Sequence, residues 1–116
     1  MNIATNSNIS FGGTINMTKG MVCYKNKLSD NAIKELGTLG LEEARGNKDK
    51  LDGKPVLNTD NIKKISTYGI SYYLPKCKEE VELRFNDMHL KQADFDSFLI
   101  AYNAAKDSNL HIDANS

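Results

Sequence analysis

Hydrophobic and polar residues alternate most regularly in two runs of the second half of the chain, residues 67–74 and 80–85. In the first run Tyr68, Ile70, Tyr72 and Leu74 fall on one side, and in the second run Val81, Leu83 and Phe85 do. A period of two is typical of strands with one buried face. The two runs therefore predict an antiparallel hairpin whose apolar faces lie on the same side.

Two other stretches have the spacing of helices. Between residues 93 and 107, apolar side chains recur at intervals of three and four, which predicts an amphipathic helix. An earlier helix is predicted to begin after Ser29, whose hydroxyl can cap free backbone N–H groups, and to continue toward Ala44. Gly37 and Gly40 weaken this helix, and we expect them either to divide it or to let another backbone approach closely.

The remaining segments give shorter signals. Gly12-Gly13 between short alternating runs predicts a hairpin, and residues 21–24 predict a further strand. Residues 46–57 contain Asp52-Gly53 and Pro55 and are predicted to be an exposed loop. A short helical turn is predicted to begin at residues 58–60 and to run through Ile65.

This order of elements predicts an α+β fold, a small antiparallel sheet with helices packed on one face. Residues 11–108 are expected to form a single compact domain, between a flexible segment at residues 1–10 and a loose tail at residues 109–116. Seven of the nine aromatic residues follow residue 64. We therefore expect the core to centre on the hairpin and the last helix, leaving the first sixty residues for flexibility and binding.

Composition limits the class of partner. The 116 residues include 15 basic and 15 acidic side chains, so the formal net charge is zero and no nucleic-acid partner is expected. No apolar run approaches about 20 residues, so no membrane span is expected. The start of the chain lacks a signal-peptide pattern, which favours a cytoplasmic protein or, alternatively, one exported without a cleaved signal. Thirteen asparagines among 116 residues favour a bacterial or mobile-element source.

Candidate chemistry is sparse. Cys77 lies between Lys76 and Lys78 at the predicted hairpin tip, and nearby cations favour a reactive thiolate. A catalytic cysteine also needs a base, and the only histidines are His89 and His111, in a predicted turn and in the tail. Cys23 has the setting of a small core residue. We predict no catalytic residue, no metal site and no cofactor.

Two apolar side chains are predicted to point away from the core: Tyr73 on the hairpin and Ile100 on the last helix. They are the candidate residues for contact with another protein or for self-association. The leading hypothesis is therefore a small non-enzymatic protein-binding module. The alternatives are a secreted effector, a cysteine-dependent enzyme, and a structural or assembly subunit whose N-terminal arm orders on contact.

Overall fold

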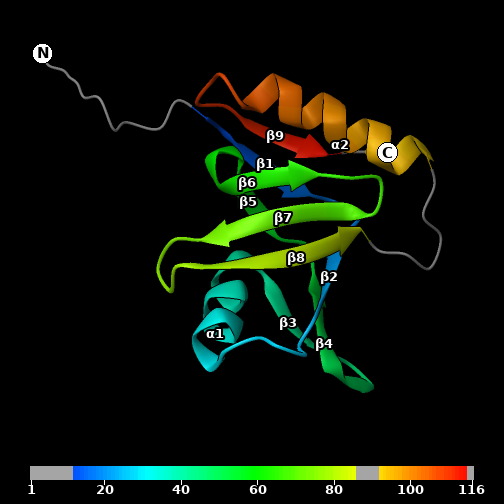
Figure 1. Ribbon diagram of the computed structural model, residues 1–116. Coiled ribbons are helices and arrows are strands. Elements are labelled where there is room, and N and C mark those ends of the chain that lie inside the picture. Colours follow the sequence, from blue (N-terminus) through cyan, green and yellow to red (C-terminus); the bar gives the residue numbers. More distant parts are fainter. Residues whose placement is uncertain (1–11, 86–91, 115–116) are drawn as a thin grey trace, which may run out of the picture.

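Most elements of the described residues are short strands, and two α-helices and one 3-10 helix complete the set. The computed structural model describes residues 12–85 and 92–114 (Figure 1). In chain order the elements are β1 (Thr14–Met17), β2 (Met21–Tyr24), α1 (Asp30–Leu39), β3 (Leu41–Ala44), β4 (Asn47–Gly53), β5 (Val56–Asn58), η1 (Thr59–Asn61), β6 (Ile62–Ile65), β7 (Gly69–Leu74), β8 (Glu79–Phe85), α2 (Gln92–Ala105) and β9 (His111–Ala114).

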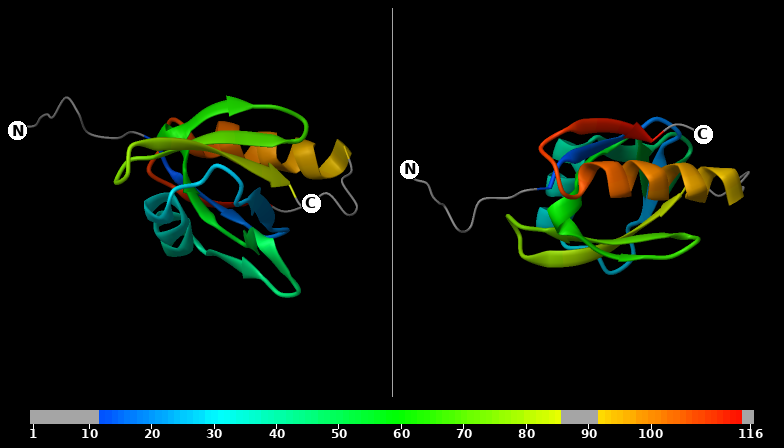
Figure 2. Two further views of the ribbon diagram at one scale, coloured as in Figure 1. Left: turned by 60° about the horizontal axis from the view of Figure 1, so that its bottom comes forward. Right: turned by 90° about the horizontal axis from the view of Figure 1, so that it is seen from above.

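The strands form two sheets. The larger sheet is antiparallel, as expected, and has the order β3-β4-β2-β8-β7-β6. The smaller sheet has the order β5-β1-β9, in which β1 pairs antiparallel with β5 and parallel with β9. The β3–β4 hairpin projects from the side of the molecule opposite α2 (Figures 1 and 2).

The predicted hairpin is confirmed as β7 and β8, which pair over six residues of each strand from Gly69↔Arg84 to Leu74↔Glu79. Val81, Leu83 and Phe85 are buried, whereas the side chains that alternate with them on β8 are exposed. The period of two thus identified both strands and their buried face, except at Tyr68, which precedes β7 and is largely exposed.

The beginning of α1 is also confirmed. Ser29 is the N-cap, and its hydroxyl oxygen accepts a hydrogen bond from the Ala32 N–H at 3.0 Å. The helix ends earlier than expected because Gly40 adopts a left-handed conformation with φ 119° and caps the C-terminus. Gly40 also lies against the backbone of Lys54 and Gly53, so the predicted close approach occurs there, whereas Gly37 faces open space.

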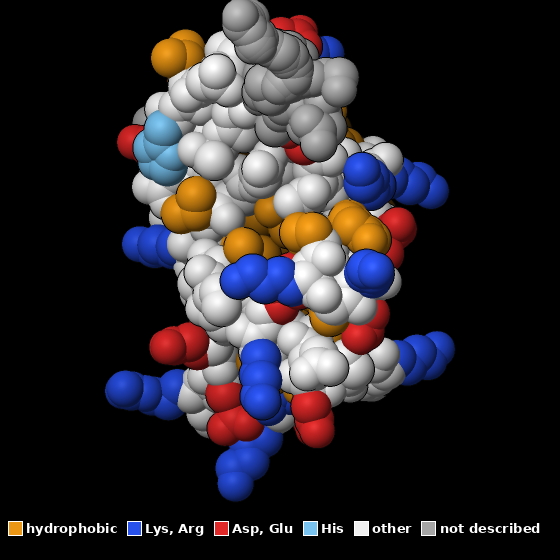
Figure 3. Space-filling view, turned by 90° about the vertical axis from the view of Figure 1, so that its left-hand side faces the viewer, with side chains coloured by type: hydrophobic (Ala, Val, Ile, Leu, Met, Phe, Trp, Pro, Cys, Tyr) orange, Lys and Arg blue, Asp and Glu red, His pale blue; other side chains and the backbone are white. Residues whose placement is uncertain are grey.

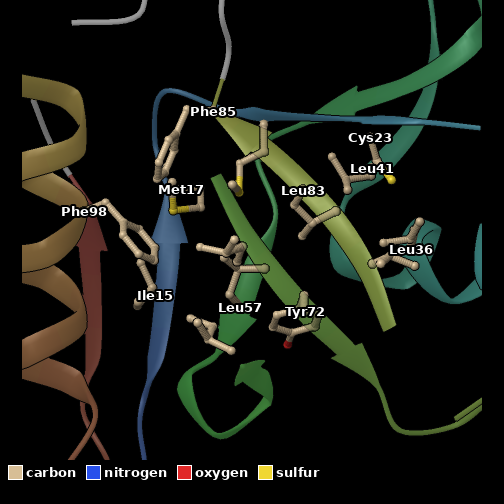
Figure 4. Packing of buried hydrophobic residues seen from close by; sticks show 14 of the residues in the cluster. Ile15, Met17, Cys23, Leu36, Leu41, Leu57, Tyr72, Leu83, Phe85 and Phe98 are labelled. Carbon is tan, nitrogen blue, oxygen red and sulfur yellow. The ribbon is translucent and has the colours of Figure 1, made fainter. Parts of the chain in front are cut away.

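The two helices contact different sheets. α1 packs against β3 and β7 of the larger sheet, and α2 packs against β9 and β1 of the smaller one. The expected arrangement, with both helices on one face of a single sheet, is therefore not what these contacts show. The hydrophobic core lies between α2 at one end and α1 at the other (Figures 1 and 4).

The core draws on both halves of the chain, which corrects the expectation that it centres on the second half. Buried residues of the first half include Ile15, Met17, Leu36, Leu51 and Leu57. They pack in one cluster with side chains from β7, β8 and α2 (Figure 4). Aromatic content located the largest side chains of the core, but the aliphatic residues of the short early strands are equally buried.

Several local predictions were wrong. Residues 46–57 are not a loop, because β4 and β5 occupy most of them. Residues 41–44 do not extend α1 but form β3, and the predicted helical turn stops at Asn61, where β6 begins. The partners of β1 are β5 and β9, so it does not belong to a hairpin turning at Gly12-Gly13.

The C-terminal region also differs from its prediction as a loose tail, because residues 111–114 form β9 alongside β1. Ala114 is buried against the core, which gives this short strand an apolar anchor. Residues 1–10, predicted to be flexible, lie outside the described residues, as does His89.

Candidate protein-contact surface

The outer face of the β7–β8 hairpin carries the residues that alternate with the buried ones. We call this set the outer face; its members are Ser71, Tyr73, Glu80, Glu82 and Arg84. Tyr73 is directly opposite Glu80, and the Lys63 ammonium of β6 lies 5.8 Å from the centroid of the Tyr73 ring. Tyr73 therefore points outward as predicted, but it is only half-exposed.

Tyr24 of β2 extends this face on the other side of β8. The Arg84 guanidinium carbon lies 5.8 Å from the centroid of the Tyr24 ring, within the range of a cation–π contact. Arg84 also approaches Glu82, with Nη2 3.4 Å from the carboxylate oxygen. Both partners of this ion pair are exposed, so it contributes little to the stability of the fold.

Two hollows meet at Glu82 and Arg84. The larger, which we call the notch, has a volume of about 490 Å³ and is lined by Cys23, Tyr24, Asn26, Lys27, Leu28, Glu80, Val81, Glu82 and Arg84. The smaller, of about 240 Å³, lies toward the β6–β7 turn and is lined by Ser66, Tyr68, Gly69, Glu82 and Arg84. Arg84 thus lies between two depressions, flanked by Tyr24 and by the 68% exposed Tyr68.

Ile100 does not join this surface. It is 71% exposed on α2, the helix that packs on the smaller sheet. The structure therefore separates the two residues that the sequence placed together as candidate contacts. Tyr73 belongs to a surface with further aromatic and arginine side chains, whereas Ile100 is an exposed aliphatic residue on another element.

A third hollow lies between α1 and the turn that joins β7 to β8. It is lined by Asn31, Lys34, Glu35, Thr38, Lys76 and Cys77. The buried Glu35 carboxylate accepts hydrogen bonds from the backbone N–H groups of Lys76 at 3.1 Å and Cys77 at 2.9 Å. Burial alone would raise the pKa of Glu35, but these two bonds, the Cys77 thiol and the Lys76 charge together lower it below 4.5.

Figure 3 shows the side of the molecule to which this turn points. Hydrophobic side chains gather across its middle, and charged side chains of both signs surround them. Because the signs are interleaved, this side presents no field of a single sign.

Neither cysteine has the electrostatics of an activated nucleophile. Desolvation and then a hydrogen bond to Glu35 raise the pKa of Cys77, which opposes the thiolate that Lys76 and Lys78 were expected to favour. Burial, with a smaller contribution from Glu82, raises the pKa of Cys23 to about 11. His111 is in β9, and its Nδ1 is 2.6 Å from the Thr14 hydroxyl, so the structure does not bring it to Cys77.

The His111 ring belongs instead to a polar ladder between β1 and β9. Its Nε2 lies 3.9 Å from the Asp113 carboxylate, which in turn accepts a hydrogen bond from the Asn16 amide at 3.2 Å. These side chains are solvent-exposed and pair across the strands in register, which is the geometry of a solvated strand surface. Within residues 12–85 and 92–114, no group of three or more His, Cys, Asp or Glu residues is placed to hold a metal ion.

Tyr24 and Arg84 were not identified from the sequence as candidate contacts. Arg84 could be assigned to the outer side of its strand, but its neighbour Tyr24 is sixty residues earlier in the chain. They meet because β2 pairs with β8 at Val22↔Arg84, and no local pattern encodes that pairing.

No protein-family model matches the chain, and comparisons with curated proteins and with solved structures likewise find no match. Among the described residues, neither helix is long and apolar enough to cross a membrane.

Proposed function

We propose that this chain is a non-enzymatic protein-binding module that docks through the outer face together with Tyr24. The observation that carries the proposal is the cation–π contact of Arg84 with Tyr24 between two hollows of the surface. Tyrosine and arginine are enriched at protein interfaces and dominate the binding free energy of many of them. Tyr73, with Lys63 over its ring, extends the same combination along β7.

The chemistry of this surface is that of contact and orientation. Arg84 offers a planar set of donors beside the Tyr24 ring and the Glu82 carboxylate. Tyr24 and Tyr68 offer large apolar areas with a polar end, and the hollows beside Arg84 can receive side chains of a partner. A partner would therefore contact aromatic rings at the centre and carboxylates at the margin.

The experiment compares two pairs of variants in capture from cells of the source organism, with quantitative mass spectrometry of the bound proteins. Tyr24→Ala with Arg84→Ala alters the proposed surface, and Ile100→Asp with Leu110→Asp alters exposed apolar residues elsewhere. We expect the first pair to lose at least one protein that the wild type and the second pair both capture. Sedimentation velocity of the same variants tests whether that protein is a second copy of the chain.

The proposal is contradicted if the Tyr24 and Arg84 variant captures every wild-type partner in full. Loss of a partner only with the Ile100 and Leu110 variant would assign the contact to the surface around these two residues instead. Circular dichroism of each variant verifies that the fold is retained, as exposed positions predict.

A further inference from the structure

The notch lies where two strands of the larger sheet separate. β2 pairs with β8 only at Met21↔Phe85 and Val22↔Arg84, although both strands continue beyond these residues. Among the described residues, no strand pairs with β8 on this side from Glu79 to Leu83.

On β8, the alternation of hydrogen bonds in an antiparallel ladder determines which backbone groups face the notch. The Phe85 N–H donates to the Tyr68 carbonyl at 2.9 Å, so the backbone of Phe85 faces β7. Successive residues face opposite sides of a strand, so Leu83 and Val81 also face β7. The N–H and C=O groups of Glu82 and Glu80 consequently face the notch.

On β2, the Lys25 N–H donates to the Asp49 carbonyl at 2.8 Å. Lys25 and Cys23 therefore face the β4 side, and Val22 and Tyr24 face β8. The backbone groups of Val22 pair with those of Arg84. Tyr24 would be opposite Glu82 if the two strands stayed paired, but their pairing ends at Val22. Two strand edges thus face each other across the notch, Tyr24 on one side and Glu82 and Glu80 on the other.

We infer that the notch binds an extended segment of a partner protein, which adds to β8 as a short strand beside Glu82 and Glu80. This rests on the proposed function and names the form of the partner. Backbone hydrogen bonds to a strand edge supply affinity in such complexes, and pockets for alternate side chains supply specificity. Cys23, Leu28 and Val81 line the notch, and the partly buried Leu28 offers the apolar surface that an inward-facing side chain can reach.

Charge defines the segment further. On β7, Ser71 is opposite Glu82 and Tyr73 is opposite Glu80, so neither carboxylate faces a cation across that pair of strands. Glu82 contacts Arg84 of its own strand at 3.4 Å, an exposed pair that solvent weakens. A residue opposite Glu82 or Glu80 on an added strand would share their face, where opposite charges attract. Because Lys27 and Arg84 also line the notch, the complementary segment carries a single basic residue there, with small or apolar residues on either side of it.

The test uses the intact chain and a phage-displayed library of linear peptides. Selected peptides are synthesised and titrated into the ¹⁵N-labelled protein. We expect enrichment of a Lys or Arg flanked by small or apolar residues, with amide shifts at Glu80, Glu82 and Tyr24 and slowed hydrogen exchange at Glu80 and Glu82. Glu82→Lys is expected to weaken binding at least tenfold, and Glu42→Lys, an exposed position on β3, to leave it unchanged.

Two results would overturn the inference. The first is a peptide whose binding shifts the amide resonances around Tyr73 but leaves the hydrogen exchange of the Glu80 and Glu82 amides unaltered. That result would agree with a protein-binding module but would exclude strand addition to β8. The second is the absence of any peptide enriched over the bare support. The proposed function is judged separately by the capture experiment, so the two failures are distinguishable.

Discussion

β7 and β2 flank the same strand, β8, and pair with it to different extents. β7 follows β8 over the full length of the hairpin, from Gly69 to Leu74. β2 pairs at two positions and then diverges toward β4. The paired side supports the core, and the open side adjoins the aromatic and arginine side chains that we propose as the binding surface.

The difference arises from how each strand is held. β7 and β8 are joined by a short turn, so they pair as neighbours in the sequence. The Glu35 carboxylate of α1 accepts hydrogen bonds from two backbone N–H groups of this turn and so anchors the end of the hairpin. β2 is instead committed along its length to β4, with four registered pairs from Met21↔Gly53 to Tyr24↔Lys50. Because β2 follows β4, its far end is carried away from β8 and the notch opens.

The largest effect should come from the buried side of β8. Leu83 is fully buried in the core, so Leu83→Ala should lower the free energy of unfolding by about 2–5 kcal/mol. Glu82→Ala, one residue away on the exposed side, should change it by less than about 0.5 kcal/mol. Urea denaturation followed by circular dichroism measures both, and similar losses for the two variants would contradict the assignment of faces.

A smaller effect should come from the closest approach of β7 to β8. A Cβ atom added at Gly69 would lie 2.1 Å from the Leu83 carbonyl oxygen, so the backbones must shift, and Gly69→Ala should cost about 1–3 kcal/mol. Gly37→Ala is the control, since nothing lies within 4 Å of the added atom. On the exposed surface of α1 it should stabilise the protein by about 0.5–1 kcal/mol. Destabilisation by both variants would show that the Gly69 effect is not specific to the strand contact.

Glu35 should give a comparable or smaller effect, and one that depends on pH. Glu35→Gln replaces a charged acceptor of two N–H groups, so at neutral pH it should lower the unfolding free energy by about 1–3 kcal/mol. The pKa of Glu35 is lower in the folded protein than its usual 4.5, so this stabilisation is present above pH 4.5 and is lost as the pH falls through the folded pKa. The wild type and the variant should therefore converge in stability in acid. A constant difference between them from pH 7 to pH 2 would contradict the role of the carboxylate.

The elements that could be predicted from the sequence are those whose local hydrophobic pattern or cap already matches the structure they adopt in the fold. β7, β8, α2 and the capped start of α1 have strong periodicity or a clear cap, and all are found. β4 was missed because only Leu51 of its seven residues is buried, so the strand depends on pairing with β2 and β3. β9 was missed for a similar reason, since four residues with one buried alanine become a strand only beside β1.

The candidate surface was predictable only in part. Alternation placed Tyr73 on the outer side of the hairpin, together with Glu80, Glu82 and Arg84. The notch forms where the pairing of β2 with β8 ends. These strands are distant in the sequence, and no local residue pattern indicates where such a pairing stops.

Hydrogen exchange along β8 distinguishes the paired side of the strand from the open side residue by residue. We expect slow exchange at the amides of Val81 and Leu83, which face β7, and at Arg84, which pairs with β2. At Glu80 and Glu82, which face the notch, exchange should be at least about tenfold faster. Equal protection of all five amides in the free protein would contradict this expectation, since a partner within the chain would then already occupy that edge.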